Sequence, residues 1–291
     1  FLIYITYGII GGFGVGMAYN SVVSAAPKWF PKKRGLVTGI SVFSFGFSTV
    51  VFAPLIEWMV AQVGVQNTFL ILAGVFCAAT LLLFKFIVTP ESVATAPIQY
   101  SGRQYSSSAM LKTPQFYLIA ITMMFGTAAY FVLNPSFVTM AQGRDLAEVA
   151  TYLVMFTGIA NALGRLALAS LSDKIGPVKA SIVIYAAMAV CIGLLTFATG
   201  WLLFAAISVI VFCYGGTSGV FMLMTGEYFG GKFQGANFGV VMLSFALSAL
   251  VFPLLMGGVN DVIKFSILAV LAFIGVLIFV ILPAIKKKNE K

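Results

Sequence analysis

The 291-residue sequence contains no histidine, only three cysteines and only eight acidic residues. Cys77, Cys191 and Cys213 lie singly in apolar stretches, without the spacing of a metal site or a disulfide framework. No constellation of nucleophile, base and orienting group can be recognised either. We therefore predict that the protein is not an enzyme, holds no metal and needs no cofactor.

Charge is scarce as well, since only 9% of residues are charged whereas 61% are hydrophobic. No soluble domain of this size can hide so much apolar surface in a core. A bilayer span needs ~20 apolar residues, and its backbone must satisfy its own hydrogen bonds, which favours helices. The sequence predicts an all-α polytopic membrane protein with nine transmembrane helices, at residues 1–26, 35–56, 68–88, 115–139, 148–171, 177–200, 201–226, 236–256 and 263–285.

The basic residues are distributed asymmetrically over these predicted helices. Fourteen of the 17 lysines and arginines fall in the odd-numbered connections or at the C-terminus. The opposite side has only Arg144 and Lys264. By the positive-inside rule the C-terminus is expected to be cytoplasmic. The net charge of +9 is thus explained by orientation in a membrane, and we expect contact with lipid and no nucleic-acid partner.

Residues 35–52 match residues 235–252 at a constant offset of 200. Seven of the eighteen positions are identical, at Gly35/Gly235, Gly39/Gly239, Ser44/Ser244, Phe45/Phe245, Ser48/Ser248, Val51/Val251 and Phe52/Phe252. Chance similarity between two apolar helices is the alternative. A parallel repeat of six helices predicts a twelve-helix architecture in which the first three helices are absent from this sequence. Its parts are helices four to six at 1–88, a cytoplasmic linker at 89–114 and a second six-helix half at 115–291.

One charged side chain, Arg165, is predicted to lie well inside a span. Ser172 marks the nearer end of that helix, seven residues or ~10 Å away. Intramembrane arginines usually face a cavity and pair with an anion, which makes Arg165 the candidate substrate contact. Asn161, one turn earlier, can steady the guanidinium or add a donor. The alternative is an arginine that reaches the inner surface or pairs with Asp173.

Other polar side chains concentrate on the first, fourth and seventh predicted helices, which points to a solute path lined by Tyr19, Asn20, Tyr130, Asn134 and Tyr214. Ser44, Ser48, Ser244 and Ser248 either line the same path or bond back to their own helices. Leu171 to Gly176 resembles a cytoplasmic loop signature of the major facilitator superfamily. By that resemblance Asp173 and Gly176 belong to a gate, whereas an ordinary solvated aspartate is the alternative.

Several stretches resemble the oxalate/formate antiporter family of the major facilitator superfamily, which is related to the monocarboxylate carriers. They are residues 28–35 (KWFPKKRG), 111–117 (LKTPQFY), Gly164-Arg165 through Ser172-Asp173, and Tyr214-Gly215-Gly216. The resemblance implies a carrier for small carboxylates in the bacterial inner membrane, and we expect this carrier to be a monomer. Its two halves are expected to rock about a site in which Arg165 binds the anion and Tyr214 forms an aromatic wall.

Phe245 departs from the family pattern, because the members that handle oxalate have a lysine there. A binding site with one cation instead of two favours a monocarboxylate over a dianion. Two alternatives to carboxylate transport remain at this point: export of a neutral or cationic solute, and a non-transporting membrane sensor with the same fold.

Overall fold

The computed structural model describes residues 2–84, 104–146, 148 and 150–289. Within these ranges the chain forms helices joined by short turns, and no strand occurs among them. In chain order the elements are the π-helix η1 (Tyr4–Gly11), α1 (Gly12–Trp29), α2 (Arg34–Leu83), α4 (Ser107–Met110), α5 (Pro114–Leu133), the 3-10 turn η3 (Asn134–Ser136), α6 (Phe137–Gln142), α7 (Ala150–Ile175), α8 (Pro177–Leu194), α9 (Gly200–Phe229), α10 (Gln234–Met256) and α11 (Asp261–Asn289).

Local sequence signals set several of these boundaries. Thr113 caps α5, because its hydroxyl oxygen accepts a hydrogen bond from the Phe116 amide at 3.4 Å, and Pro114 takes the first helical position. Gly176 separates α7 from α8 with φ at 83°, a value that favours glycine, and Pro177 then begins α8. The start of α5 and the break between α7 and α8 are therefore set by the residues that form them.

Seven helices of the described chain are long and apolar enough to cross a membrane, so the predicted count of nine is not confirmed. α7 is not among the seven, and of α2 only residues 54–83 are counted. Arg165 and Asn161 lower the mean hydropathy of α7. Both residues line the candidate site described below.

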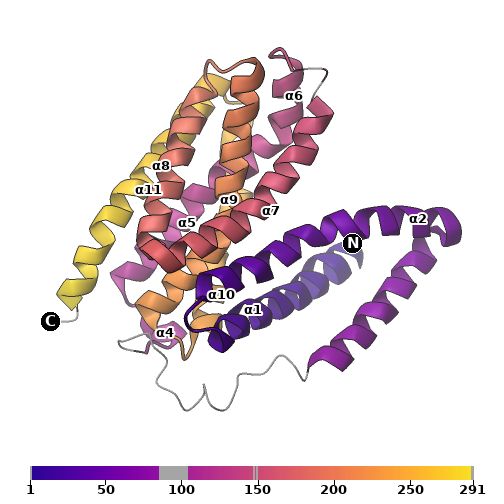
Figure 1. Cartoon of the computed structure of the whole chain (residues 1–291), viewed down its shortest axis with the longest axis horizontal. Helices are drawn as coiled ribbons and strands as arrows, with labels where there is room; N and C mark the ends of the chain where they lie inside the picture. The colour runs from indigo at the N-terminus through magenta and orange to yellow at the C-terminus, as the bar shows by residue number, and fades with distance from the viewer. Residues whose placement is uncertain (1, 85–103, 147, 149, 290–291) are drawn as a thin grey trace.

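α2 bends sharply at Gly64, where φ is 79°. The two spans predicted at 35–56 and 68–88 are thus joined by a single left-handed glycine instead of a loop (Figure 1). Residues 85–88 of the span predicted at 68–88, and residues 89–103 of the predicted linker, lie outside the described residues.

α5 and α7–α11 form one packed group, here called the C-terminal bundle, against which α1 and α2, the N-terminal pair, lean at one end (Figure 1). In the bundle α9 is central, because most of its side chains are buried. In η1 and α1, by contrast, the buried residues are Val23 and Pro27. Core side chains such as Tyr185, Phe221 and Phe279 pack between α8, α9 and α11.

Candidate functional site

Arg165 lies on α7, in the second half of the helix, with its side chain partly buried. Its Nε donates to Oδ1 of Asn161, one turn earlier, at 2.8 Å. Its Nη1 donates to the backbone carbonyl of Val42 on α2 at 3.2 Å. Both partners are neutral, so the positive charge of Arg165 is not compensated by either of them. The alternative pairing of Arg165 with Asp173 is not what the structure contains.

Glycines beside Arg165 and Tyr214 allow α7 and α9 to pack backbone against backbone. A Cβ atom at Gly164 would overlap the Phe212 carbonyl, and one at Gly215 would overlap the Asn161 carbonyl. The two sequence stretches that contain these glycines, 50 residues apart, therefore meet at one place. This contact fixes the backbone from which Arg165 and Asn161 project.

Two cavities meet at Arg165, which lines both together with Phe45. The larger, of about 750 Å³, lies between α2, α5 and α7 and is lined by Phe43, Phe45, Gly46, Phe47, Tyr130, Asn134, Met155, Thr157, Gly158, Ile159, Asn161, Ala162, Leu163, Arg165 and Val211. The smaller, of about 290 Å³, lies between α1, α9 and α10 and is lined by Gly12, Val15, Gly16, Tyr19, Phe45, Arg165, Tyr214, Gly215, Thr217, Ser218, Met242 and Phe245. Among the described residues, neither lining includes an acidic side chain, which leaves Arg165 as the charge of both cavities.

Aromatic rings form much of the wall around the guanidinium. Tyr130 and Tyr214 stack with their centroids 3.7 Å apart and their planes 5° apart. Phe131 meets Phe245 edge to face at 5.0 Å. The Arg165 guanidinium lies 5.9 Å from the centroid of Phe45, within the range of a cation–π contact. The arginine thus sits in an environment that excludes water on several sides and strengthens its attraction for an anion.

Most of the predicted substrate-binding residues converge on these cavities. Asn161 lines the larger one, and Tyr19, Tyr214 and Phe245 line the smaller one beside Arg165. Asn20 lies elsewhere: its side-chain amide donates to the Gly235 carbonyl at 2.6 Å, in the contact between α1 and α10.

The predicted gate residues lie at the end of the bundle where α7 ends and α2 begins. The Asp173 carboxylate accepts hydrogen bonds from the amides of Gly35 at 2.7 Å and Leu36 at 2.9 Å. It therefore caps the N-terminus of a helix from another part of the chain, where the helix dipole also favours a negative charge. Gly176 forms the left-handed turn three residues later.

The repeated glycines make equivalent contacts in the two places where the N-terminal pair touches the bundle. Gly35 lies against the Ala169 carbonyl of α7, and Gly39 would place a Cβ 2.9 Å from the Leu166 carbonyl. On α10, a Cβ at Gly235 would lie 3.0 Å from the Ser24 hydroxyl, and one at Gly239 would lie 3.2 Å from the Asn20 amide nitrogen. Positions matched by the 200-residue offset thus perform the same packing role.

The repeated serines are mostly bonded to their own helices. Ser44 donates to Ile40, Ser48 to Phe45 and Ser244 to Val241. Ser248 instead donates to the Met124 carbonyl of α5 at 2.7 Å. None of the four is among the residues that line either cavity.

Sequence reasoning missed Phe45, Gly46 and the Val42 carbonyl. Phe45 could have been found, because the repeat pairs it with Phe245, one of the predicted substrate-binding residues. The sequence also distinguishes Gly46 from its counterpart in the repeat, because the matching position holds Ala246. The Val42 carbonyl has no signal in a side-chain pattern, because it belongs to the backbone.

Comparisons of the sequence with known proteins find relatives among membrane transporters. The family model of the Major Facilitator Superfamily matches residues 1–253 and, in an overlapping match, residues 147–291. An uncharacterized MFS-type transporter of Escherichia coli strain K12, YhjX, is 28% identical over 86% of this chain and 63% of its own length. The oxalate:formate antiporter of Oxalobacter formigenes is 28% identical over 79% of this chain and 56% of its own length. Monocarboxylate transporter 13 of Bos taurus is 25% identical over 60% and 41%. The chain therefore spans less than two thirds of the length of these relatives.

Proposed function

Because the chain belongs to the Major Facilitator Superfamily, we propose that it is part of a secondary transporter that moves a small organic anion, a monocarboxylate, across a membrane. Transport proceeds by alternating access, in which the N-terminal pair and the C-terminal bundle rock about the Arg165 site. The superfamily and the transporter relatives indicate a transporter, which is normally not an enzyme.

One observation carries the anion assignment: Arg165 lines both cavities with only neutral hydrogen-bond partners. Asn161 and Val42 occupy two of the five N–H donors of the guanidinium, which leaves three for a ligand. A carboxylate accepts two parallel hydrogen bonds from such a fork and neutralises its charge. A cationic solute would be repelled from the same place.

The proposal of one carboxylate rather than two rests on counting charges. Phe245 lines the smaller cavity where a second cation would be needed, and no other basic residue lines either cavity among the described residues. A second carboxylate would be desolvated without a partner, at several kcal/mol. The names of the relatives, an oxalate:formate antiporter and a monocarboxylate transporter, support the chemical class.

We further propose that the C-terminus is cytoplasmic and the membrane is the bacterial inner membrane. The contacts of Asp173 with α2, and of Asn20 with Gly235, then close the cytoplasmic end. The larger cavity is lined by Asn134 and Met155, near the opposite ends of α5 and α7. This geometry corresponds to a carrier that is closed inside, with its larger cavity toward the outside.

Uptake of labelled formate into proteoliposomes that contain the full-length carrier tests the anion site. Arg165→Ala should weaken formate binding by about 100-fold or more, because two charge-assisted hydrogen bonds contribute ~1.5 kcal/mol each and 1.4 kcal/mol is tenfold. Arg165→Lys should also be impaired, since an ammonium cannot form the planar fork. Lys264→Ala, which removes a cation that is paired with Asp261 and lies outside both cavities, is the matched control and should transport normally.

Normal formate uptake by both Arg165 variants would overturn the proposal. Inhibition of transport by neutral or cationic solutes, with no effect of any carboxylate, would instead favour an exporter. Absence of any flux or ligand-dependent thermal shift would favour a membrane sensor.

A further inference from the structure

The side chain of Arg165 crosses from the C-terminal bundle to the N-terminal pair. It begins on α7 and ends at the Val42 carbonyl of α2, 123 residues away in sequence. Val42 is fully buried, so the bond lies inside the interface between the two groups of helices. The residue proposed to bind the anion is therefore also a direct polar link between the parts that must separate during transport.

Gly46 is what allows the guanidinium to reach α2. It lies one turn after Val42, and a Cβ atom there would be 3.3 Å from the Arg165 Nε and 3.5 Å from its Cδ and Cζ. An alanine at this position would crowd the guanidinium and push it away from the helix. The repeat is identical at the neighbouring pairs Ser44/Ser244 and Phe45/Phe245 but has Ala246 opposite Gly46. The glycine thus occurs on the helix that the arginine crosses and is replaced on its counterpart.

The arrangement of donors limits how a carboxylate can bind. Asn161 holds Nε, so the side of the fork that contains Nε is occupied. A carboxylate that takes two parallel hydrogen bonds uses the Nη1 and Nη2 end instead, and Nη1 already donates one of its two N–H groups to Val42. A hydrogen bond to a carboxylate is about twice as strong as one to a neutral carbonyl. Where the anion and the carbonyl compete for the same N–H group, the anion therefore wins.

We propose that Gly46 is a positioning residue that seats Arg165 against the Val42 carbonyl, and that a bound carboxylate displaces this carbonyl and releases α2 from α7. Substrate binding thereby loosens one of the contacts that hold the two groups of helices together. The inference rests on the proposed role of Arg165 as the anion site.

The first test is the affinity of purified full-length carrier for formate, measured by isothermal titration calorimetry. Gly46→Ala forces the guanidinium to shift by a few tenths of an ångström and so weakens its bond to the competing Val42 carbonyl. The variant should therefore bind formate up to roughly 10-fold more tightly, which corresponds to the contribution of one neutral hydrogen bond. Gly74→Ala is the control, because Gly74 lies on the same helix with nothing within 4 Å of its Cβ position. Unchanged or weaker binding of formate by Gly46→Ala would overturn the proposal. Weaker binding is expected if the bond from Arg165 to the Val42 carbonyl only preorganises the arginine for the anion.

The second test does not depend on the folding of the Gly46 variant. Spin labels at Val51 on α2 and Phe156 on α7, both about half exposed and outside the lining of either cavity, report the separation of the two helices in a background without native cysteines. Saturating formate should shift the distance distribution, and Arg165→Ala without formate should show the shifted distribution already. If formate binds but the distances in the otherwise unaltered protein do not change, the coupling is wrong while the anion site stands. If Arg165→Ala binds formate normally, the anion site itself is wrong.

Discussion

A single residue, Phe245, decides how many charges the site offers to a substrate. It lines the smaller cavity with Arg165 and packs edge to face against Phe131. Phe245→Lys should therefore shift preference toward oxalate by at least about tenfold, because each charge-assisted hydrogen bond is worth ~1.5 kcal/mol or more. Competition of oxalate with labelled formate uptake measures the shift.

The neutral variant Phe245→Met separates charge from packing. It retains a long apolar side chain and should keep the preference for formate. Strong oxalate uptake by the unaltered protein would contradict the charge-counting argument. Lost expression of Phe245→Lys alone would indicate that the ring serves packing against Phe131.

Among the helices, α2 depends on α7 for the capping of its first turn. Asp173 accepts from the Gly35 and Leu36 amides, so Asp173→Asn loses one acceptor oxygen and the charge that faces the helix dipole. We expect the contact between Asp173 and the first turn of α2 to lose about 1 kcal/mol. The loss is small because Asp173 is exposed and its charge is partly screened by solvent. A lower melting temperature by circular dichroism, with intact formate binding, is the expected result.

The neighbouring residue Lys174 supplies the control for that element. It is exposed on the same turn of α7, and Lys174→Ala should melt like the unaltered protein. Equal melting temperatures for Asp173→Asn and Lys174→Ala would show that the cap contributes nothing to stability, as for an ordinary solvated aspartate.

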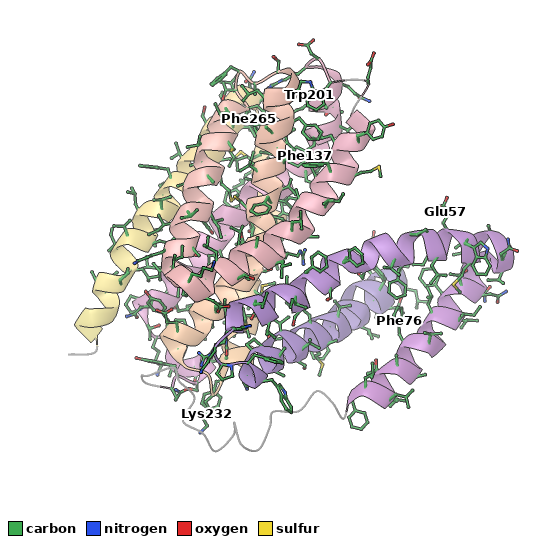
Figure 2. The ribbon with its side chains drawn as sticks, viewed as in Figure 1. Glu57, Phe76, Phe137, Trp201, Lys232 and Phe265 are labelled. Atoms are coloured by element: carbon green, nitrogen blue, oxygen red, sulfur yellow. The ribbon has the colours of Figure 1, made fainter. Side chains whose placement is uncertain are left out.

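At the scale of the whole molecule, the distribution of basic residues predicts its orientation in the membrane. Lys232, in the turn between α9 and α10, and Phe265, near the start of α11, lie at opposite ends of the bundle (Figure 2). Single cysteines at Gln142 and Ser108, both exposed, mark the Phe265 and Lys232 ends respectively. An impermeant maleimide should label Gln142→Cys in intact cells and Ser108→Cys only in inverted vesicles. The reverse pattern would contradict the positive-inside argument.

Composition and local pattern were enough for the class of protein. Lipid as solvent forces helices, so the all-α fold follows from hydropathy alone, and the superfamily resemblance is confirmed by the family match. Arg165 was identifiable because a charge in an apolar span is costly and rarely tolerated without a role.

Only the tertiary structure decided what surrounds Arg165. The predicted count of nine spans is not confirmed, because Arg165 and Asn161 lower the mean hydropathy of α7, and hydropathy does not register which side chains face a cavity. Asn20 and Tyr19 are adjacent in sequence, yet one bonds to α10 and the other lines a cavity, since neighbours on a helix point about 100° apart. The Val42 carbonyl and the space at Gly46 exist only where α2 crosses α7, and no side-chain pattern encodes that crossing.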